Sequence, residues 1–173
     1  MISIIGLKNA GKTTFLVALA AELVRRKFRV MTIKHGSHQA DMDQKGKDTW
    51  RHWHEGKAER VLMEAPGQRV LFEHTERESD PISLARTYLR DADIVLVEGF
   101  KRQPIPKLEI HRAAAARPLL FRHDEHIVAI ATDEPIDTTL PQFGLEDYDP
   151  IAEFILVHLG LPGEVRQLCM EIP

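Results

Sequence analysis

Short apolar runs and one longer apolar-rich stretch alternate along the N-terminal part of the chain. Met1–Ile5, Phe28–Ile33 and Ala92–Gly99 are short runs rich in apolar and β-branched residues. Such runs are typical of strands buried in a parallel sheet. Thr14–Arg26, between the first two runs, has the length and composition of a helix. Strand, helix and strand in this order predict a βαβ unit with parallel strands.

The middle of the chain breaks this alternation. Two strand-like runs, Glu59–Ala65 and Gln68–Thr75, flank Pro66-Gly67, a spacing that predicts a β-hairpin. We expect it to be an antiparallel edge added to the main sheet. The remaining elements predicted are helices over Thr49–Glu55, Pro81–Leu89 and Pro150–Leu159 and strands over Leu108–His111 and Ile127–Ala131. Ala113–Arg117 stays undecided.

The hairpin has a pattern that predicts an interface. Val61, Met63, Val70 and Phe72 occupy alternate positions of the two strands, which predicts that they form one apolar face. Unpaired sheet edges and apolar faces are usually covered in natural proteins. A two-fold partner would cover both, which predicts a homodimer. The alternative is that this face packs on the chain's own helix, Pro81–Leu89.

The strongest motif follows the first predicted strand. Residues 6–13 read Gly-Leu-Lys-Asn-Ala-Gly-Lys-Thr, which fits the phosphate-loop pattern G-x-x-x-x-G-K-[ST] at every fixed position. Glycines let the backbone wrap around an anion, and the N-terminus of the next helix adds N–H donors and a positive dipole end. The lysine brings a charge to the β- and γ-phosphates, and the threonine hydroxyl is placed to bind Mg²⁺. The nucleotide-binding residues predicted here are Gly6, Lys8, Asn9, Ala10, Gly11, Lys12, Thr13 and Thr14.

These elements together predict an α/β fold. We expect a mainly parallel sheet flanked by helices, as in phosphate-loop NTPases, with the added antiparallel hairpin. A single domain over residues 1–173 is expected, with residues 162–173 as a loosely held tail.

Glu98 is the second candidate for chemistry. It ends the most apolar strand of the chain and is followed by Gly99. A carboxylate at that end of a strand beside the phosphate-loop strand can hold Mg²⁺, together with Thr13. We therefore predict Lys12 and Glu98 as the catalytic pair. The alternative is an acidic residue that merely ends a strand.

A polar segment, Lys34–Asp48, begins where the second strand ends, at the sheet edge where α/β proteins bind ligands. Its length and basic character predict an anion-binding loop for a second ligand. A metal site at its two histidines is a weaker interpretation, because no cysteine or fixed carboxylate accompanies them. An ordinary solvated loop is the third. The residues predicted for the second ligand are Lys34, His35, His38, Lys47, Asp48, Arg51 and Lys101.

The sequence has no clear motif for recognition of the nucleotide base. The guanine pattern N-K-x-D is absent, and the best substitute is Asp133, which follows a late strand. Its carboxylate would accept hydrogen bonds from both N–H groups on the guanine edge. A turn aspartate before Pro135 is an equally good interpretation.

Composition narrows the class of protein. With 173 residues, 43% of them hydrophobic and 28% charged, the chain is expected to be one soluble globular domain. The net charge of −3 argues against general nucleic-acid binding. One cysteine, Cys169, excludes an internal disulfide. The lack of room for a signal peptide and of any membrane-spanning apolar run predicts a cytoplasmic protein without a membrane partner.

The order of these motifs resembles a known family. The chain resembles the molybdopterin-guanine dinucleotide biosynthesis protein B (MobB) family. The matching segments are the phosphate loop, Ile33-Lys34-His35 with His38, Asp43 with Gly46-Lys47-Asp48, the run from Asp93 through Glu98 to Lys101, and residues 131–135. The resemblance implies a homodimer that binds GTP with Mg²⁺ and hydrolyses it weakly at most. It also implies a role as adaptor to a MobA-type nucleotidyltransferase that attaches GMP to molybdopterin of the molybdenum cofactor.

Two other functions share these motifs. A small-molecule kinase or an ATP-dependent ligase would use the same loop and Glu98, but would prefer ATP. A metallochaperone-type GTPase would carry a metal ion on His35 and His38.

Overall fold

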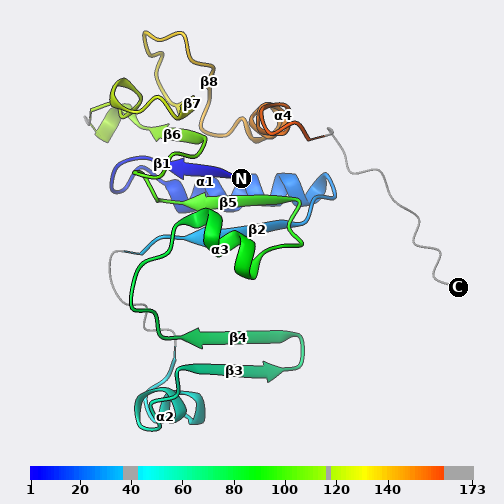
Figure 1. The fold of residues 1–173 in the computed structure, drawn as a ribbon. Coiled ribbons are helices and arrows are strands. Elements are labelled where there is room, and N and C mark those ends of the chain that lie inside the picture. The colour runs from blue at the N-terminus through cyan, green and yellow to red at the C-terminus, as the bar shows by residue number, and fades with distance from the viewer. Residues whose placement is uncertain (37–42, 116–117, 162–173) are drawn as a thin grey trace, which may run out of the picture. The chain divides into compact units, whose positions relative to one another are not determined.

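The computed structural model describes residues 1–36, 43–115 and 118–161 (Figure 1). The chain forms two compact units, Met1–His35 with Asp80–Pro173 and Gly36–Ser79. Each unit has its own sheet. The single domain expected over the whole chain stays a prediction.

The first unit is built on a six-stranded sheet in the order β2-β5-β1-β6-β7-β8, in which every pair of neighbours is parallel. Strand β5 lies between the first two strands of the chain, and β1 is paired on its other side with β6. The parallel sheet predicted from the sequence is confirmed. The strands are β1 (Ile2–Ile5), β2 (Val30–Lys34), β5 (Ile94–Glu98), β6 (Lys107–His111), β7 (Ile127–Thr132) and β8 (Gln142–Phe143).

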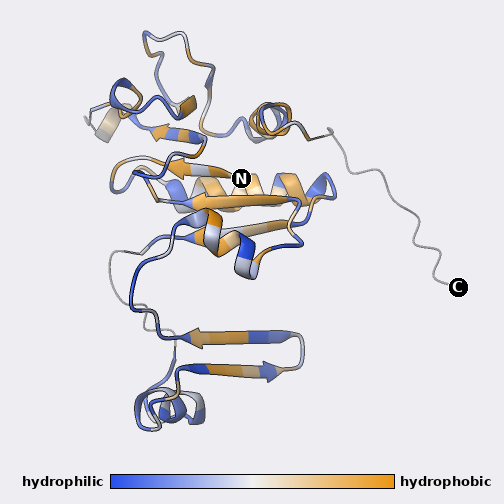
Figure 2. Cartoon of the chain, in the orientation of Figure 1, coloured by the Kyte–Doolittle hydropathy of each residue, from blue (hydrophilic) through white to orange (hydrophobic). Residues whose placement is uncertain are grey.

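Helices cover both faces of this sheet, as the unbroken apolar strands require (Figure 2). Helices α1 (Lys12–Arg25) and α4 (Tyr148–His158) pack on one face, and α3 (Pro81–Tyr88) packs on the other. Alternate residues of β5 serve the two cores: Leu96 faces α1 and α4, whereas Val97 belongs to the cluster with α3.

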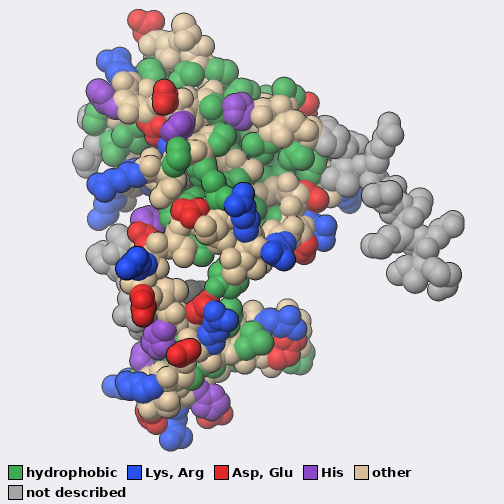
Figure 3. All heavy atoms as spheres, viewed as in Figure 1, with side chains coloured by type: hydrophobic (Ala, Val, Ile, Leu, Met, Phe, Trp, Pro, Cys, Tyr) green, Lys and Arg blue, Asp and Glu red, His purple; other side chains and the backbone are tan. Residues whose placement is uncertain are grey.

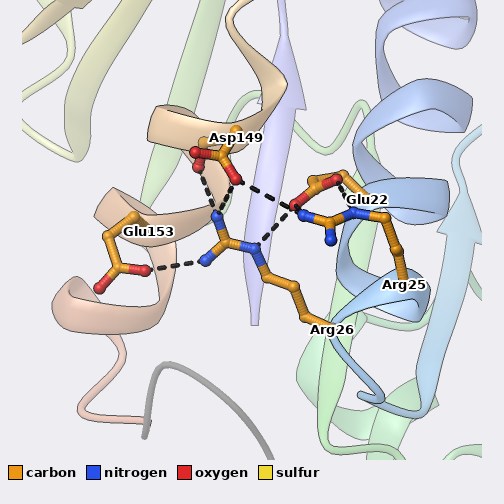
Figure 4. A network of polar contacts seen from close by, with 5 residues as sticks. All are labelled: Glu22, Arg25, Arg26, Asp149 and Glu153. Atoms are coloured by element: carbon orange, nitrogen blue, oxygen red, sulfur yellow. Dashed lines mark hydrogen bonds and ion pairs between the residues drawn. The ribbon is translucent and has the colours of Figure 1, made fainter.

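A network of charged side chains joins the end of α1 to the start of α4 (Figure 4). The guanidinium of Arg26 donates to Glu22, Asp149 and Glu153, each at 2.8 Å. Arg25 adds a bidentate pair to Glu22. Hydrogen bonds from Arg25 and Arg26 lower the pKa of Glu22 to about 2.

The face of β6 away from α1 carries buried polar side chains that hold the following segment on the sheet. Glu109 accepts backbone N–H bonds from Leu120 and Phe121 at 2.8 and 2.9 Å. Burial raises the pKa of Glu109, and these two bonds oppose the rise. Lys107, at the other end of the strand, is paired with Asp124 at 2.9 Å.

The second unit contains α2 (Asp48–His54) and the hairpin of β3 (Arg60–Ala65) and β4 (Gln68–Glu73). The hairpin is confirmed, but the expectation that it extends the main sheet is wrong, because β3 and β4 form a separate two-stranded sheet. Val61 pairs with Phe72 across the strands, and Trp53 of α2 lies against Phe72 and stacks on His74 with ring centroids 3.6 Å apart. Part of the apolar face is therefore covered within the unit.

Several boundaries differ from prediction. Strand β2 begins at Val30 rather than Phe28, because Lys27 has φ 71° and ends the preceding turn, while Phe28 enters the core. Helix α4 begins two residues before Pro150, since proline fits a first helical turn. Ala113–Ala115 is a 3₁₀ turn, and β8 has too few residues to have been recognised.

The predicted tail, 162–173, lies outside the described residues. Within the described ranges, no helix combines the length and apolar character needed to span a membrane.

Candidate functional site

The phosphate loop leaves β1 at the carboxyl edge of the sheet and ends where α1 begins. A Cβ added at Gly6 would lie 2.6 Å from the carbonyl oxygen of Ile110, so only glycine fits against β6 there. Asn9 and Gly11 have φ 68° and 86°, which curls the loop around its own N–H groups. Gly6 and Ala10 are buried and Gly11 and Lys12 are half-buried, whereas Lys8, Asn9, Thr13 and Thr14 are exposed.

Lys12 is the first residue of α1, and its ammonium group donates to the carbonyl of Leu7 at 2.9 Å. Burial lowers its pKa, and the positive charges of Lys101 and Lys34 add to that effect, while Glu98 opposes it. A cation at a helix N-terminus also faces the positive end of the helix dipole. An anion bound in the loop would offset the cost of burying this cation and the repulsion from the neighbouring lysines.

Thr13 and Glu98 come together as the sequence predicts. The register of β1 and β5 places Ile4 beside Glu98, and the Thr13 hydroxyl lies 2.9 Å from both carboxylate oxygens. Lys34, at the end of β2, lies 3.5 Å from the same carboxylate. A hydroxyl and a carboxylate at this spacing, beside a phosphate loop, fit the hard-oxygen preference of Mg²⁺.

His35 belongs to the same group of side chains. Its ring lies 4.5 Å from the ring of Phe100, and its Cβ is 3.0 Å from the position of a Cβ added at Gly99. Gly99 has φ 98°, so a side chain there would be both strained and crowded. The backbone after Glu98 is thus packed closely against the start of the predicted second-ligand loop.

The rest of that loop belongs to the second unit or is not described. Lys47 precedes α2, Asp48 begins it, and Arg51 pairs with Glu55 at 2.9 Å. Their approach to Lys34, His35 and Lys101 stays a prediction. His38 lies outside the described residues, and with it the pair proposed for a metal ion. In the ranges that are described, no group of three or more His, Cys, Asp or Glu side chains is arranged to hold a metal.

A shallow, open cleft of about 610 Å³ lies beside Asp133, at the carboxyl ends of β7 and β8. Residues 132–135 line one side and residues 142–147 the other. Asp133 itself accepts the N–H of Ala113 at 2.8 Å through Oδ1. The turn interpretation and the base-reading interpretation are therefore compatible, because a carboxylate has acceptor positions to spare.

Arg112, which sequence reasoning missed, lies between the loop and Asp133. Its Nε donates to the carbonyl of Ala10 at 3.3 Å, and its Nη1 is 3.9 Å from Oδ2 of Asp133. One signal was present: Arg112 directly follows a predicted strand. Its importance depends on that strand lying next to β1, which the sequence pattern does not give.

Comparison with known proteins gives a consistent result. The family model described as Molybdopterin guanine dinucleotide synthesis protein B matches residues 1–133. A molybdopterin-guanine dinucleotide biosynthesis adapter protein from Haemophilus influenzae is 36% identical over 159 residues, covering 90% of this chain and 86% of the relative. The protein of the same description from Escherichia coli is 30% identical, with 86% of each chain covered.

Solved structures agree with the sequence matches. A crystal structure of molybdopterin-guanine biosynthesis protein B (mobB) has a TM-score of 0.73 and 25% identity, with 91% of this chain and 98% of that chain covered. The structure of Bacillus subtilis MobB has a TM-score of 0.69 and 25% identity, with coverage of 94% and 98%. The family model covers well over half of the chain, and the phosphate loop, Glu98 and Asp133 all lie within it. The chain belongs to the molybdopterin guanine dinucleotide synthesis protein B (MobB) family.

Proposed function

We propose that this protein binds GTP with Mg²⁺ and acts as an adapter in the attachment of GMP to molybdopterin. The observation that carries the proposal is the arrangement at the start of α1. Lys12 is held among other lysines at a helix N-terminus, and Thr13 and Glu98 meet beside it. A triphosphate with its cation supplies the opposite charges that this arrangement needs.

The proposed nucleotide lies along the carboxyl edge of the sheet. Its phosphates would occupy the loop of residues 6–13 and its base the cleft beside Asp133. Thr13 and Glu98 would hold Mg²⁺, which neutralises phosphate charge when it is bound. Lys12 would stabilise charge on the β- and γ-phosphates. Hydrolysis is proposed to be weak at most, as the family resemblance implies.

The partners follow from the names of the relatives, which are adapter proteins of molybdopterin-guanine dinucleotide biosynthesis. We propose that a MobA-type nucleotidyltransferase performs the transfer. We further propose that molybdopterin, or the molybdenum cofactor, is the second ligand. Lys34 and His35 lie beside Glu98, and Lys101 acts on Lys12. These side chains of the first unit would meet the anionic groups of the second ligand.

A homodimer through the hairpin is also proposed. Met63, on the predicted interface face, is 41% exposed. Leu62 and Leu71, which pair with each other on the opposite face, are 62 and 43% exposed, and hydrophobic side chains are visible at the surface of the hairpin (Figure 3). Because Phe72 packs on Trp53, its replacement would disturb the unit itself. Met63→Lys with Val70→Lys is the better test: light scattering should show a dimer for the wild type and a monomer that still binds GTP for the variant. A monomeric wild type would contradict the proposal.

Two measurements test the function. Calorimetry with GTP and ATP, with and without Mg²⁺, should give Mg²⁺-dependent binding that favours GTP. Addition of the protein to a MobA-type transferase, GTP and molybdopterin should then raise the yield of guanylated cofactor. Preference for ATP would favour a kinase or ligase. Tight stoichiometric Ni²⁺ or Zn²⁺ binding that is lost in His35→Ala/His38→Ala would favour a metallochaperone.

A further inference from the structure

Arg112 occupies a position that the strand order makes special. Strand β6 pairs with β1 on one side and with β7 on the other. The phosphate loop follows β1, and Asp133 follows β7 directly. Because all three strands are parallel, the residue that follows β6 lies between the loop and Asp133 at the same edge of the sheet.

Contacts on the loop side hold the guanidinium of Arg112 against residues 10 and 11. Its Nε donates to the Ala10 carbonyl at 3.3 Å, and Nη2 is 3.4 Å from the position of a Cβ added at Gly11. In a phosphate loop the N–H groups turn toward the anion. A side chain that binds a carbonyl of the loop therefore leaves those N–H groups to the phosphates.

Contacts on the other side reach Asp133. Nη1 of Arg112 lies 3.9 Å from Oδ2, an ion pair rather than a hydrogen bond, while the N–H of the next residue, Ala113, binds Oδ1 at 2.8 Å. Two consecutive residues thus set the orientation of one carboxylate. A second link between the same segments runs from His111 to Glu134 at 3.2 Å.

We propose that Arg112 is a positioning residue that fixes Asp133 relative to the phosphate loop, so that reading of the guanine base is coupled to binding of the phosphates. This inference rests on the proposed GTP binding. The planar guanidinium offers donors in two directions, toward Ala10 and toward Asp133, whereas a lysine ammonium is a single point of charge. Arg112 thereby links the segment that carries Asp133 to the phosphate loop.

The test compares three ligands, namely GTP, ATP and inorganic tripolyphosphate, by calorimetry on the full chain. Arg112→Ala should lower the affinity for GTP and the GTP/ATP affinity ratio by about tenfold, which corresponds to one well-placed charged interaction. Its affinity for tripolyphosphate should stay within about twofold of the wild type, because the N–H groups of the loop are untouched. Arg112→Lys should recover little of the ratio. Arg86→Ala, an exposed arginine of α3, is the matched control and should change none of the three.

A double-mutant cycle separates positioning from general stability. If Arg112 acts through Asp133, then Arg112→Lys should lower the GTP/ATP ratio in the wild-type background but not further in Asp133→Asn. An unchanged ratio in Arg112→Lys and Arg112→Ala overturns the inference. An equal loss for tripolyphosphate and GTP also overturns it, since Arg112 would then be a phosphate ligand. A wild type that fails to bind GTP overturns the proposed function first, which distinguishes the two failures.

Discussion

The two ends of α1 both gather positive side chains, but they do so in opposite electrical settings. At the C-terminal end, Arg25 and Arg26 are bound by Glu22 and by two acidic residues of α4 (Figure 4). At the N-terminal end, Lys12 interacts with Lys34 and Lys101 as well as with Glu98. The first cluster is rich in acids, and the second is rich in bases.

The helix dipole gives this difference its meaning. Cations are stabilised at a helix C-terminus and anions at an N-terminus. The cluster at Arg26 follows that preference and ties α1 to α4, so it serves stability. The cluster at Lys12 opposes it, and burial together with the charges of Lys101 and Lys34 lowers the pKa of Lys12. Where a fold holds charges against its own field, a ligand of opposite charge is the expected function.

The largest effect should come from removing Lys12. Lys12→Ala should lower the affinity for GTP by about 100-fold or more, because its charge is directed at the phosphates. The melting temperature without ligand should not fall, since an unfavourable cation has been removed from the helix N-terminus. Calorimetry and thermal melting test both parts. If Lys12→Ala keeps the wild-type affinity for GTP, the charge of Lys12 does not serve phosphate binding.

Removal of Arg26 should give the opposite pattern. Arg26→Ala should lower the free energy of unfolding by about 2 kcal/mol, because three charged hydrogen bonds of a side chain only 10% exposed are lost. Its affinity for GTP should be unchanged. Arg25, which is 67% exposed, provides the control: Arg25→Ala should lower the free energy of unfolding much less than Arg26→Ala, because solvent screens an exposed ion pair. Equal losses in the two variants by urea unfolding would contradict the prediction.

Glu98→Gln tests whether Glu98 binds Mg²⁺. The amide keeps the shape but lacks the charge that a hard cation prefers, so Mg²⁺-dependent GTP binding should weaken by about tenfold. Binding without Mg²⁺ should change less. Without Mg²⁺ the Glu98 carboxylate competes with the phosphates for Lys34 and Lys12, and the substitution removes this competition. If both affinities fall by the same factor, Glu98 has a structural role.

Acid should weaken the charged network at the C-terminal end of α1 and so lower the free energy of unfolding. The pKa of Glu22 falls from 4.5 to about 2 in the folded chain, so its contribution to stability is full above pH 4.5 and is lost as the pH falls toward 2. Urea unfolding from pH 6 to pH 3 should therefore show a smaller loss in Glu22→Gln than in the wild type. Parallel losses would mean that the network does not hold Glu22 ionised.

The smallest effect should be a proton taken up with the nucleotide. The pKa of free Lys12 lies below 10.5, and bound phosphate should raise it again. At alkaline pH, between the two pKa values, GTP binding should therefore take up a fraction of a proton. Calorimetry in buffers of different ionisation enthalpy measures it, and Lys12→Arg should abolish the uptake because arginine stays protonated.

Much of the site follows from residues adjacent in sequence. The phosphate loop is one continuous segment, and the short apolar runs locate β1 and β5, whose parallel pairing brings Thr13 and Glu98 to the same edge of the sheet. Glycine positions, strand ends and helix starts are local properties that depend on neighbouring residues. They are therefore visible in a single sequence.

Other features depend on which segments become neighbours in space. The strand order puts β6 between β1 and β7, and this gives Arg112 its contacts. The hairpin is a sheet of its own rather than an edge, and Arg26 finds its partners across 123 and 127 positions of the chain. A local pattern specifies that a strand or a charge exists. The packing of whole elements, which minimises exposed apolar area and unpaired charge together, decides what lies beside it.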